Sequence, residues 1–103
     1  MIKVSVFYPN TPGSSFNMDY YLTQHMPMVG EKLGTACKSM AVEQGVGGLP
    51  PGAAALYRAM GHLYFDSVQA FDAAFAAHGQ AIVADIPNYT NVQPIIQISD
   101  VKM

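Results

Sequence analysis

The order in which strand-like and helix-like hydrophobic patterns follow one another constrains the fold of this chain more than any other feature. Residues 2–8 alternate with a period of two, as a β-strand does, and from Met18 the apolar residues recur at helical intervals. In chain order the predicted elements are a strand at 2–8, a helix from 18 to about 34, strands at 38–46 and 57–65, a helix from about 68, and a strand at 92–101. The order is therefore βαββαβ.

That order predicts an α+β fold of the ferredoxin-like type, in which a four-stranded antiparallel sheet carries both helices on one face. No stretch differs in composition from the rest, so we expect a single domain over residues 1–103. Phe7 in the first strand and the isoleucines of the last strand, from Ile95 to Ile98, place apolar side chains on both faces of the sheet. The uncovered face is expected to meet another sheet, most simply that of an identical chain.

The balance of apolar and charged residues also favours a homodimer and a hydrophobic ligand. Half of the residues are hydrophobic and only 12% are charged, whereas about 25% are charged in an average soluble protein. A domain of this size buries only about two thirds of its surface, so a partner or a ligand is expected to cover the excess.

Several classes of partner and location are disfavoured. The net charge is −2 and the five basic residues are scattered, which argues against nucleic-acid binding. No apolar run approaches the roughly 20 residues that cross a bilayer, and no signal-peptide pattern occurs at the start. We therefore expect no membrane contact and a cytoplasmic location.

The first helix carries its own start and break signals. Asn17 is a plausible N-cap, and Asp19 in the first turn complements the helix dipole. Pro27 lies inside the helical pattern, where it lacks a backbone donor and crowds the carbonyl of Thr23. A kink or break near His25 is therefore expected.

For the second helix, Asp66 or Ser67 is the expected cap, and Gly79 is a possible C-cap or bend. A separate short helical stretch is expected at 80–85, followed by a loop at 86–89. His78 precedes the glycine, where a cation favours the C-terminal dipole, so capping is its predicted role.

His25 is the leading candidate for chemistry because an imidazole on the inward side of an apolar helix can act as a general base or hydrogen-bond a ligand. The alternative is a core histidine whose nitrogens are satisfied by a carbonyl or a tyrosine hydroxyl. Tyr20 and Tyr21 are close enough in sequence to serve either role.

Further candidates lie on the third strand and after the second helix. His62 and Tyr64 share one face of the strand, which either lines the cleft of His25 or belongs to the dimer interface. Ala59 and Gly61 are the small residues on the other face, and they predict that another part of the structure packs close to the strand there. Tyr89 is a candidate for the mouth of the cleft, whereas Asn88 and Asp85 are expected to stabilise the local loop.

Metal and nucleotide sites are not indicated. The three histidines lack metal-ligand spacing, and Cys37 is the only cysteine, so neither a disulfide within the chain nor a cysteine-type zinc site can form. Cys37 is expected to be a buried, inert thiol. The glycines at 45–48 lack the full dinucleotide fingerprint. We therefore expect no metal and no cofactor.

Four short motifs, taken in order across nearly the whole chain, resemble the EthD family. They are Tyr8-Pro9, the segment from Phe16 to Tyr21 leading to His25-Met26-Pro27, His62-Leu63-Tyr64-Phe65, and the segment from Asp85 to Thr90. That family is named for a protein of ethyl tert-butyl ether degradation that acts alongside a haem monooxygenase system, and the resemblance implies a dimeric α+β barrel. It also implies that Tyr20, Tyr21 and His25 are pocket residues. Asn17 departs from the family pattern, in which aspartate is common.

Two functions follow, and the sequence does not choose between them. One is a cofactor-free enzyme of small hydrophobic metabolite catabolism, with oxidoreductase or monooxygenase-like activity or a proton transfer of the cyclase or dehydratase type. His25 and Tyr21 would then be catalytic, and Tyr20, His62, Tyr64 and Tyr89 would bind the ligand. The other is a non-catalytic carrier dimer in which His25 anchors one polar group. A structural dimer without ligand is a third possibility.

Overall fold

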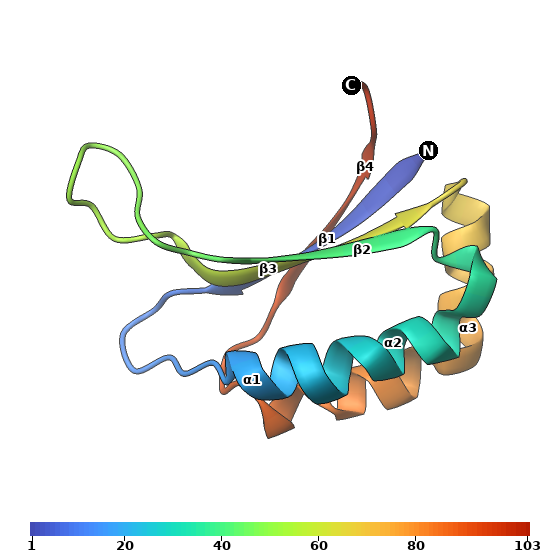
Figure 1. The fold of residues 1–103 in the computed structure, drawn as a ribbon, viewed down its shortest axis with the longest axis horizontal. Helices are drawn as coiled ribbons and strands as arrows, with labels where there is room; N and C mark the ends of the chain where they lie inside the picture. The colour runs from blue at the N-terminus through green and yellow to red at the C-terminus, as the bar shows by residue number, and fades with distance from the viewer.

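The computed structural model describes residues 1–103 and consists of one antiparallel sheet with helices packed along one side (Figure 1). The strands are β1 (Ile2–Pro9), β2 (Ser39–Gln44), β3 (Tyr57–Phe65) and β4 (Ile95–Asp100). They lie in the order β2-β3-β1-β4, so the two central strands are β1 and β3. This confirms the predicted α+β fold, although β2 and β4 are shorter than their sequence patterns indicated.

The first helical segment is continuous but changes its winding near the predicted break. It consists of α1 (Met18–Tyr20), a π-helical turn η1 (Tyr21–His25) and α2 (Met26–Leu33). The side chain of Asn17 accepts a hydrogen bond from the backbone N–H of Tyr20 at 3.0 Å, as expected of the N-cap. Because Pro27 lacks a backbone N–H, the preceding turn widens to a π-helix and no chain break is needed.

Gly34 follows α2 with φ at +62°, which an L side chain adopts only with strain, and the chain turns there into a short 3₁₀ helix, η2 (Gly34–Ala36). Cys37 comes next and is half-buried, more exposed than predicted. The helical segment therefore ends where the sequence indicated.

The second helix is one long element, α3 (Val68–Ala84), and this corrects the prediction of an end or bend at Gly79. Ser67 caps it by accepting from the backbone N–H of Ala70 at 3.1 Å. A Cβ at Gly79 would overlap the ring of Phe75, so this glycine makes room for an aromatic side chain within the helix. The separate helix at 80–85 and the capping role of His78 are therefore wrong, and only a 3₁₀ turn, η3 (Ile86–Asn88), follows.

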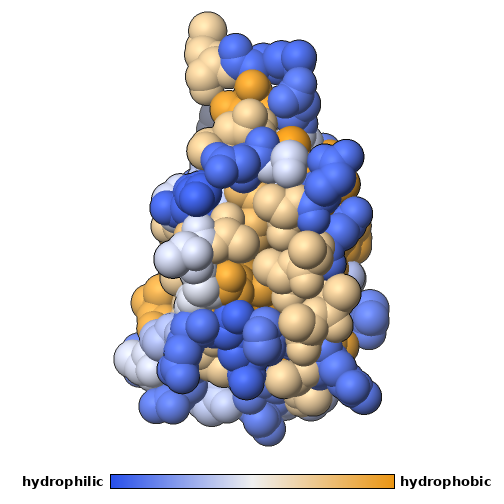
Figure 2. Space-filling model, turned by 90° about the vertical axis from the view of Figure 1, so that its right-hand side faces the viewer, coloured by the Kyte–Doolittle hydropathy of each residue, from blue (hydrophilic) through white to orange (hydrophobic).

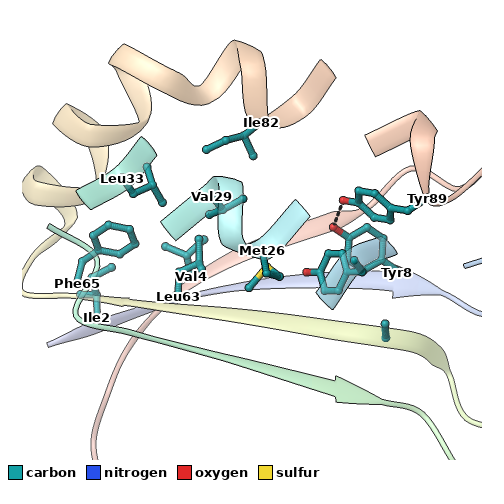
Figure 3. Close-up of a cluster of buried hydrophobic side chains, with 12 residues drawn as sticks. Ile2, Val4, Tyr8, Met26, Val29, Leu33, Leu63, Phe65, Ile82 and Tyr89 are labelled. Carbon is teal, nitrogen blue, oxygen red and sulfur yellow. Dashed lines mark hydrogen bonds between the residues drawn. The ribbon is translucent and has the colours of Figure 1, made fainter. Parts of the chain in front are cut away.

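The core lies between the sheet and the helices (Figure 3). Its members come from the helix-facing side of β1 and β3 and from the inner sides of the helices: Ile2, Val4, Tyr8, Tyr21, Met26, Val29, Leu33, Ala59, Leu63, Phe65, Ile82 and Tyr89. The predicted alternation along β3 is confirmed from Ala59 to Phe65, because both of these residues are fully buried.

The other side of the sheet carries no helix (Figure 1). The connection between β2 and β3, residues 45–56, extends beyond the sheet as an arm that contains only glycine, alanine, proline, valine and leucine. Val46, Leu49 and Leu56 on this arm are exposed. None of the helices has the length and apolar character needed to cross a membrane.

Candidate functional site

A cavity of about 180 Å³ lies between the helix layer and the sheet. Thirteen of its sixteen lining residues are hydrophobic. Polar side-chain groups reach its wall from only three residues, Tyr8, Tyr21 and His25. Figure 2, which looks at the molecule from the right-hand side of Figure 1, shows apolar residues along the middle of this face between polar borders. The cavity is large enough for a small molecule, because a cavity of about 150 Å³ holds benzene.

His25 sits at the end of the π-helical turn η1, and its side chain is only 4% exposed. Its Nδ1 lies 2.9 Å from a carboxylate oxygen, Oδ2 of Asp85. An ionised carboxylate only accepts hydrogen bonds, so Nδ1 carries the proton and the lone pair of Nε2 is a hydrogen-bond acceptor. Burial lowers the pKa of His25 and outweighs the opposing effect of Asp85, so the imidazole is neutral near pH 7.

Asp85 follows the last residue of α3 and holds His25 from behind, away from the cavity. Besides His25, it accepts hydrogen bonds from the hydroxyl of Tyr20 at 2.7 Å and from the side-chain amide of Asn88 at 2.9 Å. Burial alone would raise the pKa of the carboxyl, but these hydrogen bonds prevail and hold it below its ordinary value. Asp85 is therefore ionised over the physiological range.

Asp85 was expected from the sequence to stabilise the local loop, and its contact with His25 was not predicted. Sixty positions separate Asp85 from His25 along the chain, and no pattern in the sequence connects them. The contact arises because the C-terminal end of α3 lies beside η1 in the folded chain (Figure 1).

A cluster of three tyrosines adjoins His25. The hydroxyl of Tyr89 lies 3.4 Å from His25 Nε2. It also lies 2.7 Å from the hydroxyl of Tyr8 (Figure 3). The ring of Tyr21 packs edge-on against Tyr8 with centroids 5.6 Å apart, and it stacks on His25 with centroids 5.4 Å apart. Burial raises the pKa of all three phenols, so each stays protonated.

Gly61 on β3 completes this arrangement. A Cβ at this position would overlap the hydroxyl of Tyr21, which therefore reaches the sheet only because the residue is glycine. The sequence did indicate that small residues on this face of β3 mark a close contact. It did not identify Tyr21 as the residue that makes it.

Four of the six predicted site residues lie at or next to the cavity. His25 and Tyr21 line the cavity, and Tyr89 joins them through hydrogen bonds from behind the wall. Tyr20 lies on the far side of His25 and reaches it only through Asp85. Tyr8 belongs to the site but was expected only as a strand residue.

His62 and Tyr64 lie on the opposite face of the sheet, so they do not share the cleft of His25. They pair across the sheet with Ser5 and Lys3 of β1, whose side chains point away from the helices. His62 Nδ1 lies 2.9 Å from the hydroxyl of Ser5, and its Nε2 lies 3.0 Å from Glu43. Of the two placements that the sequence allowed, the structure has the one on the open face.

The comparison with protein families matches the EthD domain over residues 14–93. The chain belongs to the EthD family. Its structure superposes on the crystal structure of an EthD-like protein from Ralstonia eutropha JMP134 with a TM-score of 0.94 and 45% identity, covering 99% of this chain and 92% of that one. No curated protein matches the sequence.

Two more distant crystal structures share the fold. An ethyl tert-butyl ether degradation family protein from Bacillus halodurans C-125 gives a TM-score of 0.75 at 18% identity, with 99% of each chain covered. A protein from Arabidopsis thaliana gives 0.70 at 12% identity, covering 100% of this chain and 97% of that one.

In this EthD chain the cavity joins an apolar space to one neutral imidazole that a carboxylate orients. Such a histidine can accept a proton, because Asp85 stabilises the imidazolium that forms. The described histidine, cysteine and acidic side chains form no group of three or more that could hold a metal ion.

Proposed function

We propose that this EthD protein binds a small, mainly apolar molecule in the cavity between sheet and helices, and that His25 accepts a proton from it. The observation that supports the proposal is a single polar, titratable side chain in an otherwise apolar cavity wall. Thirteen lining residues are hydrophobic, and the one imidazole among them is buried, neutral and held by Asp85. This combination is typical of a ligand site with one reactive polar end.

The proton would move from the bound molecule to Nε2 of His25, while Nδ1 keeps its proton and its hydrogen bond to Asp85. The positive charge that forms on the ring is stabilised by the carboxylate 2.9 Å away. The Tyr89 hydroxyl, at the longer distance of 3.4 Å, yields the lone pair easily to a closer donor. Proton transfer on a small hydrophobic metabolite, in a pathway that also contains an oxygenase, is the role we infer.

Binding is tested by titrating the protein with cyclohexanol and following the methyl signals of Val29, Leu63 and Ile82 by NMR. These side chains line the cavity, so their signals should shift together and saturate. Val6→Phe, which fills part of the cavity, should weaken binding strongly. Leu22→Phe is the matched control, because Leu22 is half-exposed and lies outside the cavity. Equal binding by both variants would contradict the proposal.

A carrier that only holds its ligand is the alternative, and His25→Gln separates the two. A catalyst that loses its base should lose turnover while it largely keeps affinity for the ligand. A carrier should lose affinity alone, because His25 would serve only as a hydrogen-bond anchor.

We also propose that the protein is a homodimer that forms through the open face of the sheet. Ile95 on this face is 53% exposed, and the rings of Phe7 and Tyr57 pack there at 5.0 Å without a covering layer. A second copy that packs its sheet against this face would bury these side chains. The predicted cytoplasmic location stays a prediction.

The dimer is tested by light scattering at micromolar concentration. Ile95→Asp should convert the dimer to a monomer, because it places a charge among apolar side chains at the interface. Leu22→Asp is the control, since Leu22 is 49% exposed on the outer side of the helices. A wild-type protein that is a stable monomer contradicts this part of the proposal.

A further inference from the structure

The hydroxyl of Tyr21 is the one polar side-chain group of the cavity wall that forms no hydrogen bond within the protein. The hydroxyls of Tyr8 and Tyr89, by contrast, lie 2.7 Å apart and bond to each other. The structure leaves no fully buried polar side-chain atom without a partner. The Tyr21 hydroxyl is therefore not fully enclosed, and because the residue is only 2% exposed and lines the cavity, the hydroxyl is accessible from the cavity.

This hydroxyl can donate a hydrogen bond to a ligand but is not an acid that gives its proton away. Burial raises the pKa of Tyr21, so the phenol keeps its proton. No lysine or arginine lines the cavity. A negative charge that develops on an oxygen of the bound molecule must therefore be stabilised by hydroxyl groups, and the Tyr21 hydroxyl is the one that is free to do so.

The free donor and the base lie side by side. Tyr21 and His25 are the first and last residues of η1, and their rings are nearly parallel, with an angle of 13° and centroids 5.4 Å apart. Both line the cavity, so one small molecule can contact both. A neutral histidine is a weak base, and it can take a proton from carbon only where the electron pair left behind is stabilised. A carbonyl group next to that carbon provides this stabilisation, because the charge moves onto its oxygen.

We infer that the site takes a small ketone, whose oxygen accepts a hydrogen bond from Tyr21 while His25 removes a proton from the adjacent carbon. The proton moves to Nε2, and the electron pair of the C–H bond forms a carbon–carbon double bond. The π pair of the carbonyl moves onto its oxygen, which gives an enolate held by the Tyr21 hydroxyl. Return of the proton from Nε2 to carbon restores the ketone, and no electrons are gained or lost overall. The inference rests on the proposed function and names its substrate class.

The hydrogen bond is tested with cyclohexanone and methylenecyclohexane, which have the same number of non-hydrogen atoms and differ in whether the atom outside the ring is oxygen or carbon. The NMR titration on the methyl signals of Val29, Leu63 and Ile82, which line the cavity, gives both dissociation constants. Tyr21→Phe should weaken cyclohexanone about ten-fold, the equivalent of one lost hydrogen bond, and leave methylenecyclohexane unchanged. Tyr64→Phe is the matched control, because it removes the same group on the opposite face of the sheet.

Proton abstraction is tested by the exchange of the ring protons next to the carbonyl of cyclohexanone for deuterium in heavy water, followed by NMR. At saturating cyclohexanone the wild type should exchange them faster than buffer alone. His25→Gln should return the rate to that of buffer while it largely keeps affinity for the ketone. Tyr21→Phe should lower the protein-dependent rate about a hundred-fold, because the enolate oxygen loses its donor. Tyr64→Phe should keep the wild-type rate.

If Tyr21→Phe weakens both probes equally or neither, or if bound cyclohexanone does not exchange, the inference is overturned while the ligand site itself stands. If neither probe shifts the cavity signals, the proposed ligand site fails together with it. Fold is checked in each variant from the dispersion of the methyl spectrum. A crystal structure of the wild type with cyclohexanone depends on no variant. It should place the carbonyl oxygen within hydrogen-bond distance of the Tyr21 hydroxyl, and an oxygen found elsewhere would contradict the inference.

Discussion

Gly61→Ala should destabilise the protein through a single contact. The added Cβ would overlap the hydroxyl of Tyr21, and the two next-nearest atoms belong to the same side chain, Cζ at 3.4 Å and Cε2 at 3.9 Å. Tyr21 has little freedom to move, because it is 2% exposed and its ring packs edge-on against Tyr8 and Phe16. Either the ring or the strand β3 must shift.

The magnitude follows from two contributions. Overpacking of a well-packed core costs about 1–3 kcal/mol. Replacing glycine by alanine restricts the unfolded chain, which offsets about 0.4–1 kcal/mol. The free energy of unfolding should fall by about 1–2 kcal/mol, which lowers Tm by roughly 5–15 °C in a domain of this length.

The assay is a double-mutant cycle measured by urea unfolding. Tyr21→Phe removes the hydroxyl that the new Cβ meets, so Gly61→Ala should cost much less in the Tyr21→Phe background than in the wild type. The interaction energy between the two sites is then at least about 1 kcal/mol and favourable for the double variant. Costs that simply add would refute the contact between Tyr21 and Gly61.

Three further predictions concern the helices and the His25 pair. Burial lowers the pKa of His25 below its ordinary value of about 6.5. The contribution of the neutral imidazole to the free energy of unfolding should therefore be fully present above that pH and should be lost as the pH drops toward the folded-state pKa. His25→Gln should lack this part of the decline in urea titrations. Asp85→Asn removes the charge that favours imidazolium, so the NMR titration of His25 should move to lower pH. Ser67→Ala removes the N-cap of α3 and should lower the free energy of unfolding by about 1 kcal/mol, measured in the same way.

The fold was predictable because the decisive signals are local. The alternation in residues 2–8, the cap at Asn17 and the disturbance by Pro27 each act within a few residues, and the structure has all three. Gly79 shows the limit of such signals. A glycine near the end of a helical stripe usually marks a C-cap, but here the ring of Phe75 lies over it and the helix continues.

The candidate site was only partly predictable, since its geometry depends on contacts between distant segments. The spacing of helix residues placed His25 and Tyr21 on an inward face, and both line the cavity. Alternation along β3 shows that His62 is on the face opposite Gly61, yet it does not say which face the helices cover. Asp85 was missed for the same reason, because only the packing of α3 beside η1 brings it to His25.

We propose that the cavity is a ligand site whose polar end is formed by His25 and the tyrosines. The most direct measurement is a crystal structure of the protein with cyclohexanol. We expect density for the ring among Val4, Val29 and Leu63, with the hydroxyl within hydrogen-bond distance of His25 Nε2 or of the hydroxyl oxygen of Tyr8 or Tyr21. A cavity that side chains close, or a ligand found only at the molecular surface, would contradict it.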